Sequence, residues 1–247
     1  MPDHESRGVG MPVVRRWLVI STILSLFAVA CLAWVTITLT QTSTAQTRSV
    51  PGSRITTIPA KPDGACRRGR ATLYDECSDQ LMIFETAMER AAAENKVLLV
   101  SYGAEWCIWC HVFAKYIHGG TTRFEYTYGS PAAPEARHRS TIFERAEQDV
   151  TADAAALSAY VGSSFVVVHI DAQYAPNGKA VLEATGAAPF AGDGIPFIFT
   201  VDRKGRYAAH VEGNLVEIRR DTDDWYRGYD RRKLLTELQR SYTAASR

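Results

Sequence analysis

The sequence has no surplus of charge of either sign and contains few cysteines. Of its 247 residues, 28 are Lys or Arg and 27 are Asp or Glu, so the formal net charge is only +1. Because a nucleic-acid-binding surface needs an excess of basic residues to offset phosphate charge, this balance argues against a nucleic-acid partner. Five cysteines are too few to stabilise so long a chain in the way that disulfides stabilise small secreted proteins. A hydrophobic core must supply the stability instead, and 46% of the residues are apolar.

An uncharged apolar run lies close to the N-terminus. Residues 17–39 contain no charged side chain, and a helix of that length is long enough to cross a bilayer core of about 30 Å. Signal peptides usually have apolar cores of only about 7–15 residues, so the length favours an uncleaved membrane anchor. A cleaved signal peptide is the alternative, because Ser43-Thr44-Ala45 has the small-residue pattern of a cleavage site.

The residues on either side of this run predict how the chain is organised. Arg15 and Arg16 border the run, which favours a cytoplasmic tail of residues 1–16. The rest of the chain is then expected in the periplasm, held at the inner membrane by this single span, or secreted to the periplasm if the segment is cleaved. Residues 40–65 are rich in Thr, Ser, Pro and Gly without periodicity, which predicts a flexible tether. The globular domain is expected over residues 66–247.

Helical and strand patterns alternate through the globular part. Apolar residues at spacings of three and four predict helices at about 79–95, 111–118, 151–160 and 230–242. Short apolar runs typical of buried strands occur at 97–102, 165–171, 195–202 and 207–211. Helices that alternate with such strands indicate a layered α/β fold.

Two cysteines, Cys107 and Cys110, lie where the first predicted strand gives way to a helix. Unpaired N–H groups and the dipole at a helix N-terminus stabilise the thiolate form of the first cysteine. Only a thiolate attacks a disulfide, so Cys107 is the expected nucleophile. Cys110 lies one turn later and can resolve the mixed disulfide, which leaves an oxidised Cys107–Cys110 pair.

The run from Val97 to Cys110, with Ala104-Glu105-Trp106-Cys107 before the second cysteine, resembles the thioredoxin superfamily. Gly194-Ile195-Pro196, just before an apolar strand, is similar to the cis-proline loop of that family. The resemblance covers roughly residues 79–239, apart from an insertion at about 119–164. It implies a thioredoxin-like fold, a central mixed sheet flanked by helices.

The resemblance also implies a function and a set of site residues. The activity would be thiol–disulfide exchange on protein substrates, with a redox partner protein and with neither a bound cofactor nor a metal. Cys107 would attack and Cys110 would resolve. Ile195 would offer main-chain hydrogen bonds to an extended substrate segment, Pro196 would shape the groove, and Trp106 would flank the nucleophile.

The sequence departs from the family pattern at three places. Ser101 stands six positions before the first cysteine, where the family has a buried acidic residue that assists proton transfer from the resolving thiol. The dipeptide between the cysteines is Ile108-Trp109 in place of the usual Gly-Pro, so the direction of exchange stays open. The insertion contains the aromatic run 124–128, and a segment this long beside the site could select substrates or elaborate the packing.

Two other functions are compatible with the motif. Cys107-x-x-Cys110-His111 also matches the attachment pattern of a covalent c-type haem, with His111 as the iron ligand. A redox-inert, thioredoxin-like module that only binds proteins is the other alternative.

The remaining cysteines lie away from the motif. In an oxidising compartment, Cys66 and Cys77 are expected to form a structural disulfide that ties the tether to the domain, and closing so short a loop stabilises by roughly 2–3 kcal/mol. Their alternative role is a redox relay that exchanges with Cys107. Cys31 lies inside the apolar run, where it is expected to act as a small apolar residue.

Overall fold

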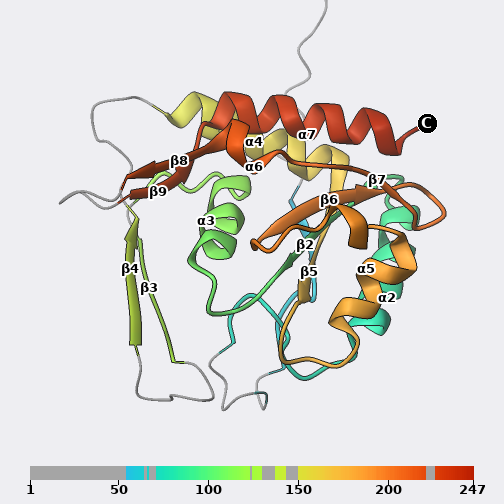
Figure 1. Ribbon diagram of the computed structural model, residues 1–247. Helices are drawn as coiled ribbons and strands as arrows, with labels where there is room; N and C mark the ends of the chain where they lie inside the picture. Colours follow the sequence, from blue (N-terminus) through green and yellow to red (C-terminus); the bar gives the residue numbers. More distant parts are fainter. Residues whose placement is uncertain are drawn as a thin grey trace, which may run out of the picture. The chain divides into compact units, whose positions relative to one another are not determined.

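The computed structural model describes residues 54–63, 66, 71–122, 124–129, 137–142, 150–220 and 226–247, all within the unit Val50–Arg247 (Figure 1). The predicted cytoplasmic tail, the membrane anchor and most of the tether lie outside these residues. Within the described ranges, no helix combines the length and the apolar character that a membrane crossing requires.

The centre of this unit is a mixed sheet of five strands. From one edge to the other they are β1 (Thr56–Ile58), β5 (Phe165–Asp171), β2 (Val97–Gly103), β6 (Phe197–Val201) and β7 (Tyr207–His210). Strands β1, β5 and β2 are parallel, whereas β6 and β7 each run antiparallel to the strand before them in this order. The α/β fold and the four strands expected from apolar runs are therefore confirmed.

Strand β1 was not expected from the sequence. Residues 56–58 fall in the segment predicted to be a tether, yet they pair in register with Val166–Val168 of β5. These three residues therefore belong to the sheet. A run of three residues is too short to show any periodicity, while the Pro and Gly around it resemble a linker.

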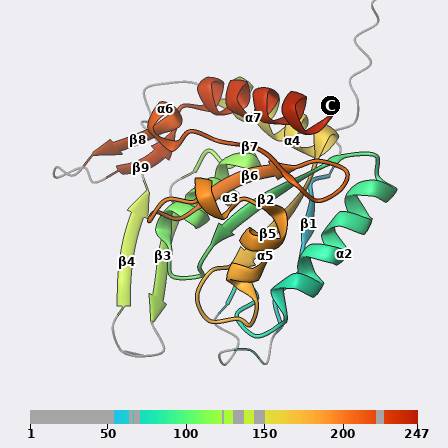
Figure 2. The same ribbon diagram turned by 45° about the vertical axis from the view of Figure 1, so that its right-hand side comes forward.

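Helices cover both faces of the sheet. Helices α2 (Gln80–Ala93) and α5 (Gly178–Thr185) pack on one face, and α3 (Ile108–Ile117), α4 (Thr151–Ser164) and α7 (Arg231–Ala245) pack on the other (Figures 1 and 2). The predicted helix starts are confirmed for two of them, since Asp79 caps α2 and Asp230 caps α7 through hydrogen bonds from backbone N–H groups.

Side-chain alternation along β2 decides which residues meet the α3 face. Leu98 and Val100 belong to the core beneath α2 and α5, whereas Leu99 belongs to the core beneath α3, α4 and α7. Ser101 follows the same alternation as Leu99, and it lies in register with His169 of β5. Two fully buried polar side chains, Ser101 and His169, therefore lie side by side under α3.

The chain between α3 and α4 contains an added hairpin. Strands β3 (Phe124–Gly129) and β4 (Arg137–Ile142) form a two-stranded antiparallel sheet, and β3 contains the aromatic run of the expected insertion. Helix α4, inside the same expected segment, contributes the fully buried Leu157 and Val161 to the core that it shares with α3 and α7. The last part of the segment thus completes one layer of the fold.

Several short elements after β5 carry no clear sequence pattern. Besides α5, they are the 3₁₀ turn η2 (Ala188–Phe190), the helix α6 (Gly213–Val216) and the hairpin strands β8 (Glu217–Arg220) and β9 (Tyr226–Tyr229). Tyr229 of β9 is buried against α3, where its ring makes edge contacts with Trp109, Phe113 and Tyr116. The second hairpin therefore holds α3 in place from the side away from the sheet.

Candidate functional site

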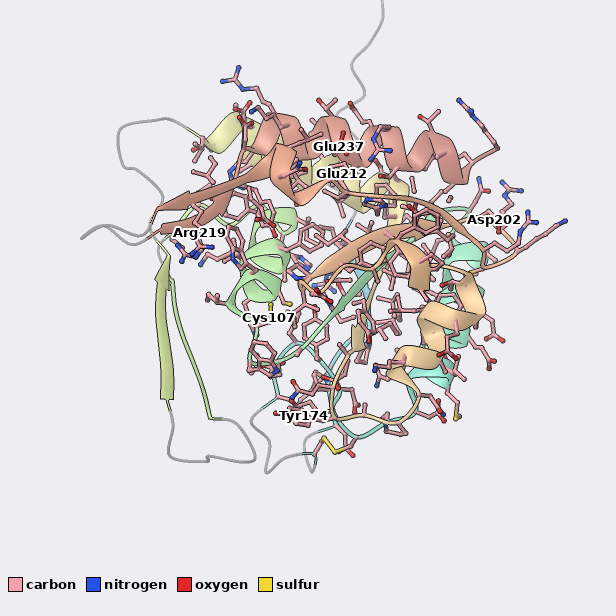
Figure 3. The ribbon with its side chains drawn as sticks, in the orientation of Figure 1. Cys107, Tyr174, Asp202, Glu212, Arg219 and Glu237 are labelled. Carbon is pink, nitrogen blue, oxygen red and sulfur yellow. A yellow bond between two sulfur atoms is a disulfide. The ribbon has the colours of Figure 1, made fainter. Side chains whose placement is uncertain are left out.

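The cysteine pair lies at the junction of β2 and α3, as predicted. Cys107 is the N-cap of α3, and its sulfur accepts a hydrogen bond from the backbone N–H of Cys110 at 3.3 Å. Figure 3 shows Cys107 at the start of this helix. Both cysteines are free thiols, with Cys107 4% and Cys110 0% exposed. A helix N-terminus thus faces the sulfur of Cys107, while the second sulfur is enclosed behind it.

The loop before β6 reaches the first cysteine. The Cys107 thiol donates a hydrogen bond to the carbonyl oxygen of Ile195 at 3.4 Å, and Ile195 packs against the buried cluster that contains both cysteines. The Ile195–Pro196 peptide bond is cis. The structure therefore brings the two predicted substrate-binding residues of this loop to the nucleophile.

Trp106 lies at the exposed rim of the site. Its side chain is 40% exposed, and its indole N–H donates to the Gln173 side chain. Gln173 belongs to the loop after β5, whose backbone N–H groups donate to the carboxylate of Asp171. The hydrogen bond to Gln173 thus holds Trp106 at its predicted position beside the nucleophile.

Tyr74 is a site residue that the sequence did not reveal. Its fully buried hydroxyl lies 2.9 Å from the Ser101 hydroxyl, and Tyr74 packs in the same buried cluster as Cys110. Burial raises the pKa of Cys110 well above its usual range, as does the neighbouring Cys107 sulfur, while the Tyr74 hydroxyl acts in the opposite direction. Burial likewise raises the pKa of Tyr74.

Gly103 provides the space in which these groups meet. A Cβ atom at this position would lie 2.5 Å from the Cys110 sulfur and 2.6 Å from the Tyr74 hydroxyl oxygen. Both distances are shorter than any non-bonded contact of a carbon atom, so a side chain at residue 103 would displace one of the two groups.

A short segment, residues 72–77, carries Tyr74 to the cysteines, and we call it the strap. The fully buried carboxylate of Glu105 accepts hydrogen bonds from the backbone N–H groups of Thr72, Leu73 and Tyr74, each at 2.9 Å. It also accepts a hydrogen bond from the Thr72 hydroxyl at 2.8 Å. The residue two positions before the nucleophile therefore fixes the start of the strap.

The end of the strap is held by Asp75 and a disulfide. The Asp75 carboxylate accepts the backbone N–H groups of Cys77 at 3.0 Å and of Ser78 at 2.8 Å. Burial alone would raise the pKa of Asp75, but these hydrogen bonds outweigh it and lower the pKa. Cys77 is disulfide-bonded to Cys66, with the Cα atoms 5.7 Å apart, so the predicted pairing is present. In Figure 3 the yellow disulfide lies well apart from Cys107, which favours its structural role over the relay.

Two buried histidines lie near the pair. The Nε2 atom of His111 is 2.7 Å from the backbone carbonyl oxygen of Glu105, and burial lowers the pKa of His111 although the Glu105 carboxylate acts against it. His169 contacts the Tyr74 ring edge-on at 5.2 Å between centroids. Burial, and then the charges of His111 and His118, lower its pKa to about 3, so His169 is neutral at neutral pH.

The predicted residues thus meet in one site, and the comparisons with known proteins add no assignment. Trp106, Cys107 and Cys110 come from one segment and Ile195 from another, and Cys66 and Cys77 act from a distance through the strap. The described residues contain no cluster of three or more potential metal ligands. No protein-family model matches the chain, and no curated protein matches it either.

Proposed function

We propose that the protein is a thiol–disulfide oxidoreductase of thioredoxin-like fold that acts on protein thiols or disulfides. The observation that carries the proposal is the asymmetric pair: Cys107 lies at a helix N-terminus and hydrogen-bonds a loop carbonyl, and Cys110 is enclosed behind it. The strand order β1-β5-β2-β6-β7, with the pair between β2 and α3, is compatible with that fold.

The exchange proceeds in two steps in which atoms and electrons balance. The Cys107 thiolate attacks one sulfur of a substrate disulfide, so that a Cys107–substrate bond forms and the second substrate sulfur leaves as a thiolate that takes up a proton. Cys110 then attacks the Cys107 sulfur, and the Cys107–Cys110 disulfide forms as the remaining substrate thiolate leaves. The substrate gains two electrons, and a partner dithiol returns the enzyme to its reduced form. The same steps in reverse oxidise a substrate.

Substrate proteins would dock across Ile195, Pro196 and Trp106. These residues offer backbone hydrogen-bonding groups and an exposed indole beside the reactive sulfur, which suits an extended segment of a protein. We place the domain in the periplasm, because the Cys66–Cys77 disulfide is expected to persist only in an oxidising compartment. Residues 17–39 would anchor it as a single span in the inner membrane.

The residues do not fit a covalent haem at this motif. The Nε2 atom of His111, the one that would bind iron, faces the Glu105 carbonyl oxygen at 2.7 Å, and the residue is 9% exposed. Cys110 would have to leave the buried cluster to form a thioether bond. Thiol–disulfide exchange requires neither rearrangement.

Variants of the two cysteines test the proposal. In the full chain, Cys110→Ser should accumulate mixed disulfides with other proteins, because the captured substrate is no longer released by the second cysteine. Cys107→Ser should capture none through this site, since the remaining thiol of the pair, Cys110, is fully buried. Non-reducing gels followed by identification of the captured proteins measure both effects and show which proteins are substrates.

The double variant Cys107→Ser/Cys110→Ser is the matched control. Equal capture by both single variants would contradict the assignment of Cys107 as the attacking cysteine and Cys110 as the resolving one. If neither variant captures a protein and the wild type reduces no disulfide substrate, the enzyme proposal fails and the redox-inert binding module becomes the better description.

A further inference from the structure

We propose that Tyr74 is a further catalytic residue, whose hydroxyl donates a hydrogen bond to the Cys110 sulfur while that thiol gives up its proton in the resolving step. Ser101 acts as the positioning residue that orients the Tyr74 hydroxyl. This inference rests on the proposed exchange reaction and concerns its second half.

The geometry places the phenol and the thiol together in one buried cluster. Tyr74, Ser101 and Cys110 are each 0% exposed, and the phenol oxygen lies 2.9 Å from the Ser101 oxygen. The Cys110 sulfur and the Tyr74 oxygen converge on the small space left by Gly103. The same cluster contains Cys107, so the hydroxyl lies where the resolving sulfur must act.

A buried thiol needs such a donor in order to become a nucleophile. Removing the proton from Cys110 creates a negative charge without water around it, and an unpaired charge in such a place is strongly disfavoured. A hydroxyl aimed at the sulfur stabilises that charge as it develops, and a preorganised donor of this kind acts mainly on the transition state. Because burial keeps the Tyr74 phenol protonated, Tyr74 is a donor and is not the base.

The other polar groups near the pair are poorly placed for this role. The Glu105 carboxylate already accepts three backbone N–H groups of the strap. His169 meets the Tyr74 ring rather than the sulfur. The Tyr74 hydroxyl, in contrast, lies beside the Cys110 sulfur at the space left by Gly103.

The proton has a defined destination. In the resolving step the Cys110 sulfur forms a bond to the Cys107 sulfur, and the Cys107–substrate bond breaks. The substrate sulfur leaves as a thiolate and accepts the proton that Cys110 has lost. Tyr74 keeps its own proton throughout, so no further reactant is required.

Two-phase kinetics with an aromatic disulfide separate this step from the first one. The full chain carrying Cys31→Ser and an intact Cys66–Cys77 disulfide has two reactive thiols, Cys107 and Cys110. Its reaction with 5,5′-dithiobis(2-nitrobenzoate), followed by stopped flow, releases one thionitrobenzoate as Cys107 attacks and a second as Cys110 resolves. Tyr74→Phe should leave the first phase unchanged and slow the second about tenfold or more, the effect of losing one hydrogen bond to a charged group.

Two further variants make the result specific. Ser101→Ala keeps the phenol but loses its orienting partner, so it should slow the second phase by a smaller factor of about three. Tyr102→Phe removes a tyrosine hydroxyl from the opposite face of the sheet and should change neither phase. Thermal melts confirm that each variant is folded.

The possible outcomes are distinct. A second phase that is as fast in Tyr74→Phe as in the parent protein, or an equal slowing of both phases, would overturn the role of Tyr74. If the parent protein itself releases no second thionitrobenzoate, then Cys110 does not resolve, and the proposed function fails rather than this inference alone.

Discussion

At the residue scale, the most restrictive position of the site is one that carries no side chain. Gly103 ends β2, and the sulfur of Cys110 and the hydroxyl of Tyr74 both lie within 2.6 Å of the point that a Cβ atom would occupy there. The site therefore requires glycine at residue 103, because any side chain there would overlap these two groups.

Gly103→Ala should separate these two groups. The added methyl would overlap both of them, so we expect a loss of about 1–3 kcal/mol in the free energy of unfolding, as is usual for overpacked cores. It should also slow resolution by Cys110 while attack by Cys107 persists. Chemical denaturation and the two-phase thiol assay measure these effects. Gly192→Ala is the matched control, because a Cβ at residue 192 meets nothing within 4 Å.

The sequence predicted some site residues and missed others for a physical reason. Cys107, Cys110 and Trp106 share one short motif, and Ile195 precedes a recognisable strand, so local pattern was enough to find them. Tyr74 meets Ser101 across 27 positions, and it meets Glu105 across 31. Such contacts depend on the path of the strap, which no local periodicity describes.

At the scale of elements, Glu94 joins β1 to the end of α2. Its carboxylate accepts hydrogen bonds from Thr56 of β1 at 2.8 Å and from Lys96 at 2.6 Å, and it pairs with Arg90 of α2. Partial burial alone would raise the pKa of Glu94, but these hydrogen bonds outweigh it and lower the pKa to about 2 from an ordinary 4.5. The edge strand is thus held partly by a charge.

The contribution of Glu94 should therefore depend on pH. A group with a lowered pKa in the folded state stabilises above its ordinary value and loses that effect as the pH falls toward 2. Glu94→Gln should cost about 1 kcal/mol of unfolding free energy at pH 6, and its difference from the wild type should shrink at pH 3. Urea denaturation at the two pH values measures this. Glu89→Gln, exposed on the same helix, should show no such trend, and a constant difference for Glu94→Gln would contradict the assignment.

The length of each segment decided whether its helix or strand could be predicted from the sequence. Long periodic or apolar segments gave the helices α2 and α7 and the strands β2 and β5 nearly at their observed bounds. Strand β1 has three residues and α5 has eight, which is too few for periodicity to outweigh the surrounding turn residues. Neither hairpin was found, because a pair of short strands is specified by its partner more than by its own composition.

At the scale of the whole described unit, the site is assembled from segments far apart in the sequence. The strap precedes β2, the cysteines follow it, and Ile195 comes just before β6. The sheet brings these segments together because β5 and β6 flank β2 on either side. Composition alone pointed to a hydrophobic core as the source of stability, and the two buried clusters on the faces of the sheet agree with this.

Because the Glu105 carboxylate alone accepts three backbone N–H groups of the strap, these amides should exchange with solvent in a characteristic way. The amide hydrogens of Thr72, Leu73 and Tyr74 all point to Glu105, and a hydrogen-bonded amide exchanges with solvent only when its bond opens. Three amides that share one acceptor should open as one unit, so NMR should give them a common opening free energy in deuterium oxide. Glu105→Gln should accelerate all three together, and three unrelated rates in the wild type would contradict the shared opening. Deuterium uptake at these amides would then report how often the protein uncovers its resolving cysteine.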